Sequence, residues 1–377
     1  MLQFHTMSGV TSGNLAASFA PSIDTPSESP WPIVGHSWAV HLLRRSLQTT
    51  GPRHAYLFLG PPQVGKRTLA RAFAQSLLCT APDLNQRPCG ECRACRLAAR
   101  DSHPDLQWVQ PLDKDGAVDR ANGMLRVEQA AGIIHDAALR PLEGRYKVFM
   151  IQDAHTANDS FANKLLKTLE EPPDHVVLCL TALDRSSLLP TILSRCQILE
   201  LRPLPIDQVE RALIERWQAA PEQAALLARL ANGRLGWAVD QLNDADGLGR
   251  REAQLAQLLH LVHANRIERL DFAEQAAVGR NNQDLFAMLE LWTTWWRDVL
   301  LVQVGCPEAC SNIDRQAELA RHAAALTPQQ VRDYLLTLRR IDGYLHHTVN
   351  TRLALDLLLL QLPHIAPVPS GAGNGES

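Results

Sequence analysis

The stretch GPPQVGKRT carries most of a phosphate-binding loop. The pattern G-x-x-x-x-G-K-[ST] cradles phosphates with backbone N–H groups, reaches them with its lysine, and uses the final hydroxyl as a magnesium ligand. Gly60, Gly65 and Lys66 occupy their positions. Arg67, however, replaces the hydroxyl, and Thr68 follows one residue too late. The sequence therefore predicts a loop that is folded for phosphate but has lost one magnesium ligand.

The second position that would hold magnesium is also altered. An NTPase of this class needs an Asp at the end of its second strand to hold the ion, beside an acid that activates the attacking water. In MIQDAH, Gln152 stands at the Asp position and Asp153 at the position of the second acid. Because two groups that serve one ion are altered together, we expect ATP either not to bind or to bind without hydrolysis.

Four cysteines form a separate group with the spacing C-x9-C-x2-C-x2-C, namely Cys79, Cys89, Cys92 and Cys95. A two-residue gap lets a tight turn direct both sulfurs at one ion, and four thiolates complete a closed tetrahedral zinc site. Four free thiols and a redox pair are the alternatives, although redox C-x2-C motifs usually occur as single pairs. The segment has little apolar material, so we expect structural Zn²⁺ to supply its folding energy.

Alternating strands and helices would position these residues. AYLFLG predicts a buried strand that leads into the glycine loop, and RTLARAFAQSLLC predicts a helix with Leu69 and Phe73 inward. A second strand is expected over 147–155, a helix over 160–171, and a third strand in HVVLCLTA. This order predicts a three-layer α/β domain with a parallel sheet over residues 31–201.

Beyond LRPLP the apolar spacing is helical. It predicts a small helical domain over 202–246 and a larger all-helical domain over 248–364. Trp292, Trp295 and Trp296 share one helical face, which favours packing or a helix interface over ligand stacking.

The ends and the composition restrict the classes of partner. Residues 1–30 and 365–377 are rich in Ser, Pro and Gly and predict a disordered extension and a flexible tail. The first segment lacks the basic and apolar blocks of a secretory signal, and the apolar runs are too short for a membrane span. With a net charge of -3 there is no general basic field for nucleic acid. We therefore expect a cytoplasmic protein with no membrane partner.

Several motifs together resemble the AAA+ clamp-loader subunits of bacterial DNA polymerase III. They are HAYLFLGPPQVGKRTLARAFAQSLLC, the four-cysteine insertion, ANKLLKTLEEPP and LLPTILSRCQ. The altered magnesium positions are similar to the delta-prime branch, whose nucleotide site is degraded, whereas gamma and tau keep an intact site. The resemblance implies an AAA+ P-loop domain with a zinc module at 79–95, a helical lid over 202–246 and a collar domain over 248–364.

The resemblance also implies a role for the triplet Ser194, Arg195 and Cys196. In the family its arginine reaches the gamma-phosphate of ATP bound to the neighbouring subunit. A guanidinium suits this task because it is always charged and offers a planar fork of donors. An ordinary surface ion pair is the alternative for Arg195.

Two further nucleotide-sensing positions depart from the family pattern. Ala182 and Leu183 stand where the first sensor is polar, with Thr181 adjacent. Gly236 stands at the place of the second sensor arginine, so that only Arg234 is near enough to replace it.

The function implied by the resemblance is that of a stator in DNA replication, without intrinsic ATPase, which lends Arg195 to a neighbour. Its partners would be gamma/tau and delta subunits and, through the complex, the sliding clamp and primed DNA. One alternative is a gamma/tau-like ATPase in which Lys66, Thr68 and Asp153 suffice. Another is a zinc-containing DNA-binding module whose basic residues are Arg87, Arg93, Arg96 and Arg100.

Glu170 and Glu171 end a predicted helix at its negative pole. Acidic residues there are unfavourable unless they are paired. We expect at least one of them to meet a basic group in the adjoining loop or across a subunit contact; two solvated acids are the alternative.

Overall fold

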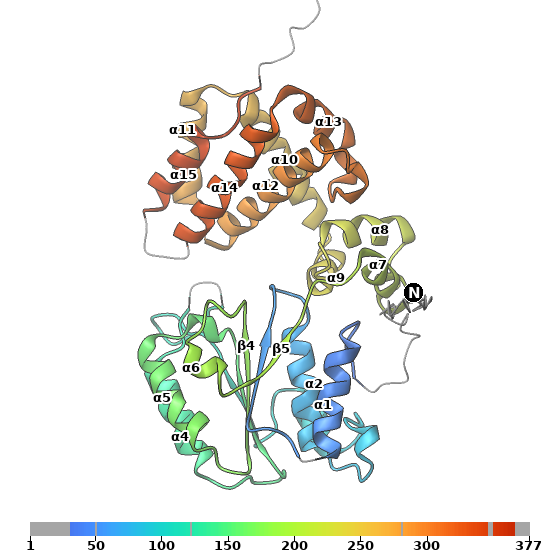
Figure 1. The fold of residues 1–377 in the computed structure, drawn as a ribbon, viewed down its shortest axis with the longest axis vertical. Helices are drawn as coiled ribbons and strands as arrows, with labels where there is room; N and C mark the ends of the chain where they lie inside the picture. Colours follow the sequence, from blue (N-terminus) through green and yellow to red (C-terminus); the bar gives the residue numbers. More distant parts are fainter. Residues whose placement is uncertain (1–30, 50, 121–122, 280–281, 346–349, 366–377) are drawn as a thin grey trace, which may run out of the picture.

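The computed structural model describes residues 31–365 (Figure 1), with gaps at residues 50, 121–122, 280–281 and 346–349. The predicted extension at 1–30 and all but the first residue of the predicted tail at 365–377 lie outside the described residues.

The described residues contain one parallel sheet of five strands in the order β2-β3-β4-β1-β5. The strands are β1 (Ala55–Leu59), β2 (Leu106–Val109), β3 (Lys147–Ile151), β4 (Val176–Ala182) and β5 (Gln197–Glu200). Every residue of β1 and β4 is buried. Continuous apolar runs are expected for central parallel strands that are covered on both faces. The predicted parallel α/β sheet is confirmed.

Two strands were not predicted, and one predicted strand is shorter than expected. The sequence did not predict β2 and β5, which are edge strands of four residues with partly exposed positions and therefore lack a long apolar run. The strand predicted over 147–155 ends at Ile151. After it, Asp153 adopts φ 51°, and the chain forms the short 3-10 helix η2 (Ala154–Thr156) instead of extending the sheet.

Helices cover both faces of the sheet. On one face lie α1 (Ser37–Gln48), α2 (Lys66–Leu78) and α3 (Arg93–Ala99), preceded by the 3-10 helix η1 (Leu84–Gln86). On the other lie α4 (Val127–Ala137), α5 (Asp159–Glu170) and α6 (Pro190–Leu193). Tyr56 and Phe73 meet edge to face at 4.7 Å in the first layer, and Phe149 and Phe161 are buried in the second. The site residues are thus carried by a rigid three-layer core.

A second core follows the sheet domain. It is formed by α7 (Ile206–Trp217), α8 (Pro221–Leu230) and α9 (Leu235–Asn243), around Val209 and Leu227. Figure 1 shows these three helices between the sheet domain and the last group of helices.

The remaining helices form a third core. They are α10 (Gly247–His263), α11 (Arg266–Gly279), α12 (Asn282–Gln303), α13 (Gln316–Ala325), α14 (Pro328–Leu345) and α15 (Thr351–Leu360), with the 3-10 helices η3 (Pro307–Ala309) and η4 (Ile313–Arg315). Trp292, Trp295 and Trp296 are at most 1% exposed, which confirms the packing interpretation. Trp295 Nε1 donates to His322 Nδ1 at 3.2 Å, and burial lowers the pKa of His322 to about 4. In the described part of the chain, every helix is too short or too polar to span a bilayer.

Candidate functional site

The sheet brings the predicted nucleotide residues to one edge. The carboxyl ends of parallel strands share an edge of the sheet, and the loop after β1 begins there with Gly60. Its N–H donates to the Leu183 carbonyl after β4 at 3.0 Å. Gly60 has φ +142°, and a Cβ there would lie 2.4 Å from the Leu201 carbonyl oxygen. Only glycine fits this position, so the loop keeps the backbone requirement of a phosphate loop.

Lys66 is turned onto its own loop. Its Nζ donates to the carbonyl oxygens of Gly60 at 2.5 Å and Pro61 at 2.8 Å, and the residue is 8% exposed. Burial lowers the pKa of Lys66 to about 8, a shift that the nearby charge of Asp153 opposes. An ammonium group has three N–H donors. Two of these donors are used by carbonyl groups of the loop. In an intact phosphate loop, this lysine reaches the phosphates instead.

Arg67, at the position of the missing hydroxyl, points to the edge of the sheet. Its guanidinium carbon lies 4.7 Å from the centre of the Trp108 ring on β2, and its Nη2 lies 3.6 Å from the Asp101 carboxylate. Asp101 also pairs with Arg71 at 2.5 Å. Arginine has five donors and no acceptor, so Arg67 is unable to ligate a cation. Thr68 is exposed on α2.

The residues after β3 are paired with protein groups. Gln152 is buried, and its Oε1 accepts from Gln110 Nε2 at 2.9 Å. The Asp153 carboxylate pairs with Arg120 at 3.1 Å, while the Asp153 N–H donates to Thr181 Oγ1 at 3.0 Å. Among the described residues, neither of the two predicted magnesium positions carries a carboxylate, and that of Asp153 beside them is paired with a guanidinium.

The small helical core rests directly on the loop. The Gly236 N–H, at the start of α9, donates to the Gln63 carbonyl at 2.9 Å, and a Cβ on Gly236 would lie 2.7 Å from that oxygen. Gln63 Nε2 also donates to Asp240 at 2.7 Å. Arg234, which the sequence left as a possible sensor, forms an ion pair with Glu290 of α12.

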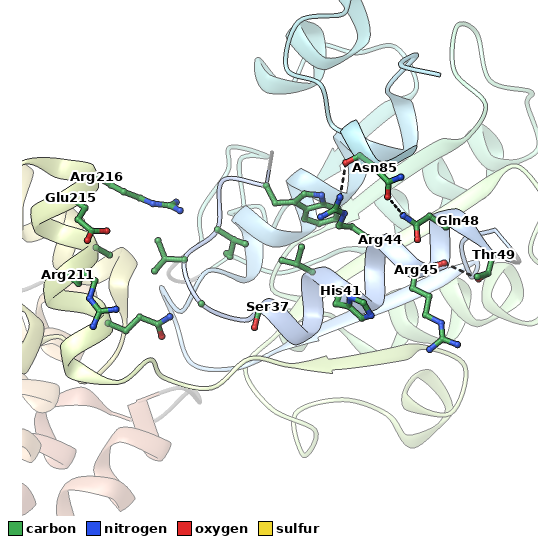
Figure 2. A pocket seen from close by; sticks show the side chains of 17 residues that line it. Ser37, His41, Arg44, Arg45, Gln48, Thr49, Asn85, Arg211, Glu215 and Arg216 are labelled. Carbon is green, nitrogen blue, oxygen red and sulfur yellow. Dashed lines mark hydrogen bonds between the residues drawn. The ribbon is translucent and has the colours of Figure 1, made fainter. Parts of the chain in front are cut away.

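A groove of about 840 Å³ opens between α1 and α7 (Figure 2). Its charged lining comes from both helices and comprises His41, Arg44, Arg45, Arg211, Glu215 and Arg216. Arg44 donates to the Asn85 carbonyl at 2.8 Å. The lining residues do not include those of the phosphate loop, so this hollow is distinct from the loop itself.

Arg195 follows α6 and lies beside the end of α5. Its Nη2 is 2.8 Å from Glu170 Oε1, and its Nη1 donates to the Thr191 carbonyl at 3.0 Å and to Ser194 Oγ at 3.3 Å. The Arg195 side chain is 33% exposed and that of Glu170 50%. A helix-end glutamate thus has a basic partner, as predicted, but this partner lies 25 residues away, between α6 and β5, and not in the loop that adjoins α5. The same contact is the surface ion pair that the sequence left open for Arg195, so its finger role remains a prediction.

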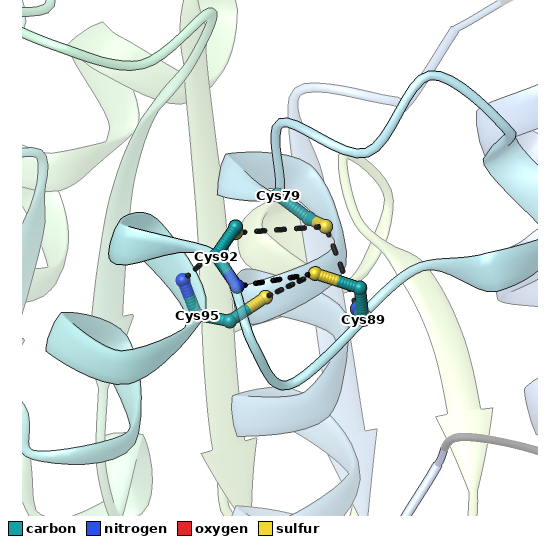
Figure 3. A group of neighbouring side chains, drawn as sticks. All are labelled: Cys79, Cys89, Cys92 and Cys95. Atoms are coloured by element: carbon teal, nitrogen blue, oxygen red, sulfur yellow. Dashed lines mark hydrogen bonds between the residues drawn. The ribbon is translucent and has the colours of Figure 1, made fainter.

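The four cysteine sulfurs lie together (Figure 3), all within 4.8 Å of one another. The Cys89–Cys95 and Cys79–Cys92 sulfur pairs are both 4.0 Å apart. Sulfurs around a tetrahedral zinc ion with bonds of about 2.3 Å lie about 3.8 Å apart. The geometry of the cluster therefore fits a four-coordinate metal ion.

The cysteines of the cluster differ in their pKa: burial raises the pKa of Cys79 and Cys95, whereas hydrogen bonds favour the thiolate of Cys92. The Cys92 N–H points at the Cys89 sulfur at 3.4 Å, and the Cys95 N–H at the Cys92 sulfur at 3.3 Å. Burial alone would raise the pKa of Cys92, but hydrogen bonds from Thr80 and Cys95 lower it to about 6. Metal binding requires the deprotonated sulfur, so these contacts match the chemistry of a metal site.

The basic surface of the cysteine module is smaller than its sequence suggests. Arg93 pairs with Glu143 at 2.9 Å, and Arg87 Nε donates to the Ala81 carbonyl at 2.7 Å. Both guanidinium groups are therefore partly engaged by acceptors of the protein.

Four residues of the site were missed by sequence reasoning: Gln63, Gln110, Arg120 and Glu290. Gln63 occupies a variable position of the loop, and Arg120 belongs to a stretch without strand or helix periodicity. Their partners are 33 to 177 residues away in the sequence. The separation explains why no local signal identified them.

Comparison with known proteins extends this description. Residues 35–205 match the family model described as "DNA polymerase III, delta subunit". The chain is 30% identical over 325 residues to DNA polymerase III subunit delta' of Bacillus subtilis, which covers 85% of this chain and 94% of that protein. It is 28% identical over 349 residues to subunit tau of Escherichia coli, covering 87% of this chain and 53% of tau, so it spans about half of that relative. A gamma subunit-related protein from Thermotoga maritima is similar in structure over 86% of this chain and 98% of that one, at 16% identity and a TM-score of 0.43.

Proposed function

Since the chain belongs to the family of DNA polymerase III delta-prime subunits, with 30% identity across nearly the whole of one such subunit, we propose that it is the delta-prime subunit of a clamp loader. It is an AAA+ stator with little or no ATPase of its own. It assembles with gamma/tau and delta subunits in a ring that places a sliding clamp on primed DNA. Its contribution to hydrolysis is Arg195, lent to the ATP of a neighbouring subunit.

The proposal that the nucleotide site is inactive rests on the residues at the two magnesium positions and on their contacts. Arg67 lies over Trp108 at the first, and Gln152 is bound to Gln110 at the second. Magnesium prefers oxygen ligands in near-octahedral geometry. An edge with one paired carboxylate gives the ion too few protein oxygens, so nucleotide is either not bound or bound without hydrolysis.

The position of Arg195 supports its role toward a neighbour. The side chain lies on the surface, one third exposed, and ends in a guanidinium that pairs bidentately with phosphate oxygens. Arginine fingers in related NTPases raise the hydrolysis rate by about 10³ to 10⁵. The role requires one accessible guanidinium at the surface of this chain, and Arg195 supplies it.

The cysteine cluster serves as a structural zinc site in this proposal. Cys79, Cys89, Cys92 and Cys95 would hold the ion, which would supply folding energy to the module at 79–95. Four thiolates leave no open coordination position for catalysis.

The division into domains follows the same family pattern. Residues 31–201 form the AAA+ domain, 202–246 the lid and 248–364 the collar that joins other subunits. Each segment has its own buried core, which supports these limits. On α15 the exposed side chains Leu353, Leu357 and Leu360 follow one another at helical spacing. An exposed apolar stripe of this kind favours contact with another subunit.

The decisive experiment is reconstitution with a gamma-type partner and comparison of the wild type with Arg195→Ala. We expect the rate of ATP hydrolysis at the neighbouring site that Arg195 contacts to fall by about 10³-fold or more. In a single-turnover measurement, the contribution of that one site to the total hydrolysis would be lost. Arg93→Ala is the matched control, because Arg93 is also exposed and paired with a glutamate. Undiminished hydrolysis in the Arg195→Ala ring would refute the role. Turnover by the isolated chain with Mg²⁺-ATP, abolished by Lys66→Ala, would favour the gamma/tau-like alternative.

A further inference from the structure

The guanidinium of Arg195 is fixed from two sides within its own chain. Glu170 accepts from Nη2 at 2.8 Å, while Thr191 and Ser194 accept from Nη1 at 3.0 and 3.3 Å. These contacts use up to three of the five N–H donors of an arginine. At least two donors stay available for an external anion.

Glu170 stands on a rigid support. It is the last residue of α5, whose first turn is capped by Asn158 accepting from the Phe161 N–H at 2.7 Å. The inner face of the helix is buried in the sheet domain through Phe161, Leu165 and Leu169. The position of the Glu170 Cα is therefore set by the core, and its carboxylate transmits that position to Arg195.

Glu171 differs from its neighbour in this respect. It follows the end of α5 and is exposed. Among the described residues, no basic group lies within ion-pair distance of Glu171. The chain thus offers two adjacent glutamates of the same chemistry, of which one contacts Arg195.

We propose that Glu170 is a positioning residue for Arg195, holding the guanidinium in place at the surface so that its free donors meet the phosphate of a neighbouring subunit. This inference rests on the proposed function and adds a second residue to it. A long arginine side chain has many rotamers, and fixing it in advance removes part of the ordering cost of the reactive complex. Glu170 itself acts only through Arg195.

The test uses the reconstituted ring with ATP in single-turnover conditions. We expect Glu170→Ala to lower the hydrolysis rate at the seam by about three- to tenfold, as an unfixed but still present finger would, with little change in the ATP concentration for half-maximal rate. Glu170→Gln keeps an acceptor oxygen and should lose less. Glu171→Ala should leave the rate unchanged.

A double-mutant cycle separates positioning from a general structural effect. In the Arg195→Ala background, Glu170→Ala should have no further effect on hydrolysis, because coupled residues are not additive. The inference is overturned if Glu170→Ala leaves the rate unchanged or raises it. It is equally overturned if the same loss appears in the Arg195→Ala background or with Glu171→Ala.

A second measurement tests the positioning role of Glu170 without relying on ATP hydrolysis, and so remains informative if the proposed function is wrong. The ¹⁵Nε relaxation of Arg195 in the isolated full chain reports the order of its guanidinium group. We expect that order to fall in Glu170→Ala and to be preserved in Glu171→Ala, with unchanged thermal unfolding in both. If Arg195→Ala does not slow the ring, the proposed function fails, and an unchanged Arg195 order in Glu170→Ala then overturns the positioning role as well.

Discussion

The sequence predicts an altered ion site at one end of α2 and a complete one at the other, and the structure differs between the two ends. At the first turn, Lys66 donates to carbonyls of its own loop, and Arg67 lies against Trp108. Just after the last turn, the Cys79 sulfur lies 4.0 Å from that of Cys92 in a group of four. Oxygen ligands are missing from one end, whereas sulfur ligands are complete at the other.

In the proposed function, this difference is that of a site that has lost its ion without losing its fold. The loop before α2 is held by contacts within the protein: the Gly236 N–H donates to the Gln63 carbonyl, and Lys66 donates to the Gly60 carbonyl. The cysteine module has few apolar residues with which to make such replacements. We therefore expect the stability of the cysteine module to depend on its metal ion, and the loop to be independent of magnesium.

Removal of the metal should have the largest effect. We expect about one zinc ion per chain by elemental analysis of the full-length protein, and its loss in Cys89→Ser. The module should then lose about 5 kcal/mol or more of stability, because structural zinc in small modules contributes about 10–16 kcal/mol of apparent binding energy. Chemical denaturation, with hydrogen exchange at α3, measures this loss.

Cys306→Ser is the control for that experiment, because Cys306 is a partly exposed thiol outside the cluster. It should retain the metal and the stability of the wild type. A wild-type chain that is equally stable without bound metal would remove the contrast between the two ends of α2.

Restoring the missing oxygens should have an intermediate effect. The double substitution Arg67→Thr with Gln152→Asp returns a hydroxyl and a carboxylate to the two magnesium positions. We expect Mg²⁺ to strengthen the binding of ATP to this variant by about tenfold, or about 1.4 kcal/mol, measured by calorimetry with and without the ion. The wild type should show no such dependence, and equal magnesium dependence in both proteins would contradict our account of the loop.

Titration of Lys66 should give the smallest effect. Its pKa is lowered from 10.5 to about 8 by burial. The folded lysine therefore loses its proton at lower pH than the unfolded one, so the unfolded chain binds more protons between pH 8 and 10.5, and stability should rise with pH in this window.

The sequence contains five lysines, so ¹³Cε resonances allow this titration to be followed directly. Lys66→Met assigns the signal and removes its part of the pH dependence. A Lys66 signal that still moves near pH 10.5 would show that the ammonium is hydrated rather than enclosed by its loop.

The parts of the fold that the sequence predicted correctly are those with strong local patterns. The continuous apolar runs of β1 and β4 identify central strands, and the spacing of the three tryptophans identifies a buried face. In contrast, β2 and β5 have four residues each at the sheet edges, where half-exposed positions interrupt any pattern.

In the candidate site, too, the sequence predicted the features that have a local signal and missed the partners that lie far away in the chain. Spacing alone placed the cysteines together, and the charge of a helix end indicated that Glu170 needs a basic partner. The identity of that partner depended on the fold, because Arg195 is 25 residues away. Arg120 reaches Asp153 across 33 residues, and such a pairing leaves no mark on the sequence around either residue.

The close approach of Gly236 to Gln63 has a consequence for motion. A hydrogen bond of 2.9 Å joins α9 to the loop tip, with no room for even a methyl group between them. In an enzyme that opens and closes around ATP, the angle between these two bodies would change with each turnover. Here the contact between Gly236 and Gln63 restricts that angle. We expect this subunit to keep one angle between its sheet domain and its small helical domain, while the angle changes in neighbouring subunits that hydrolyse ATP.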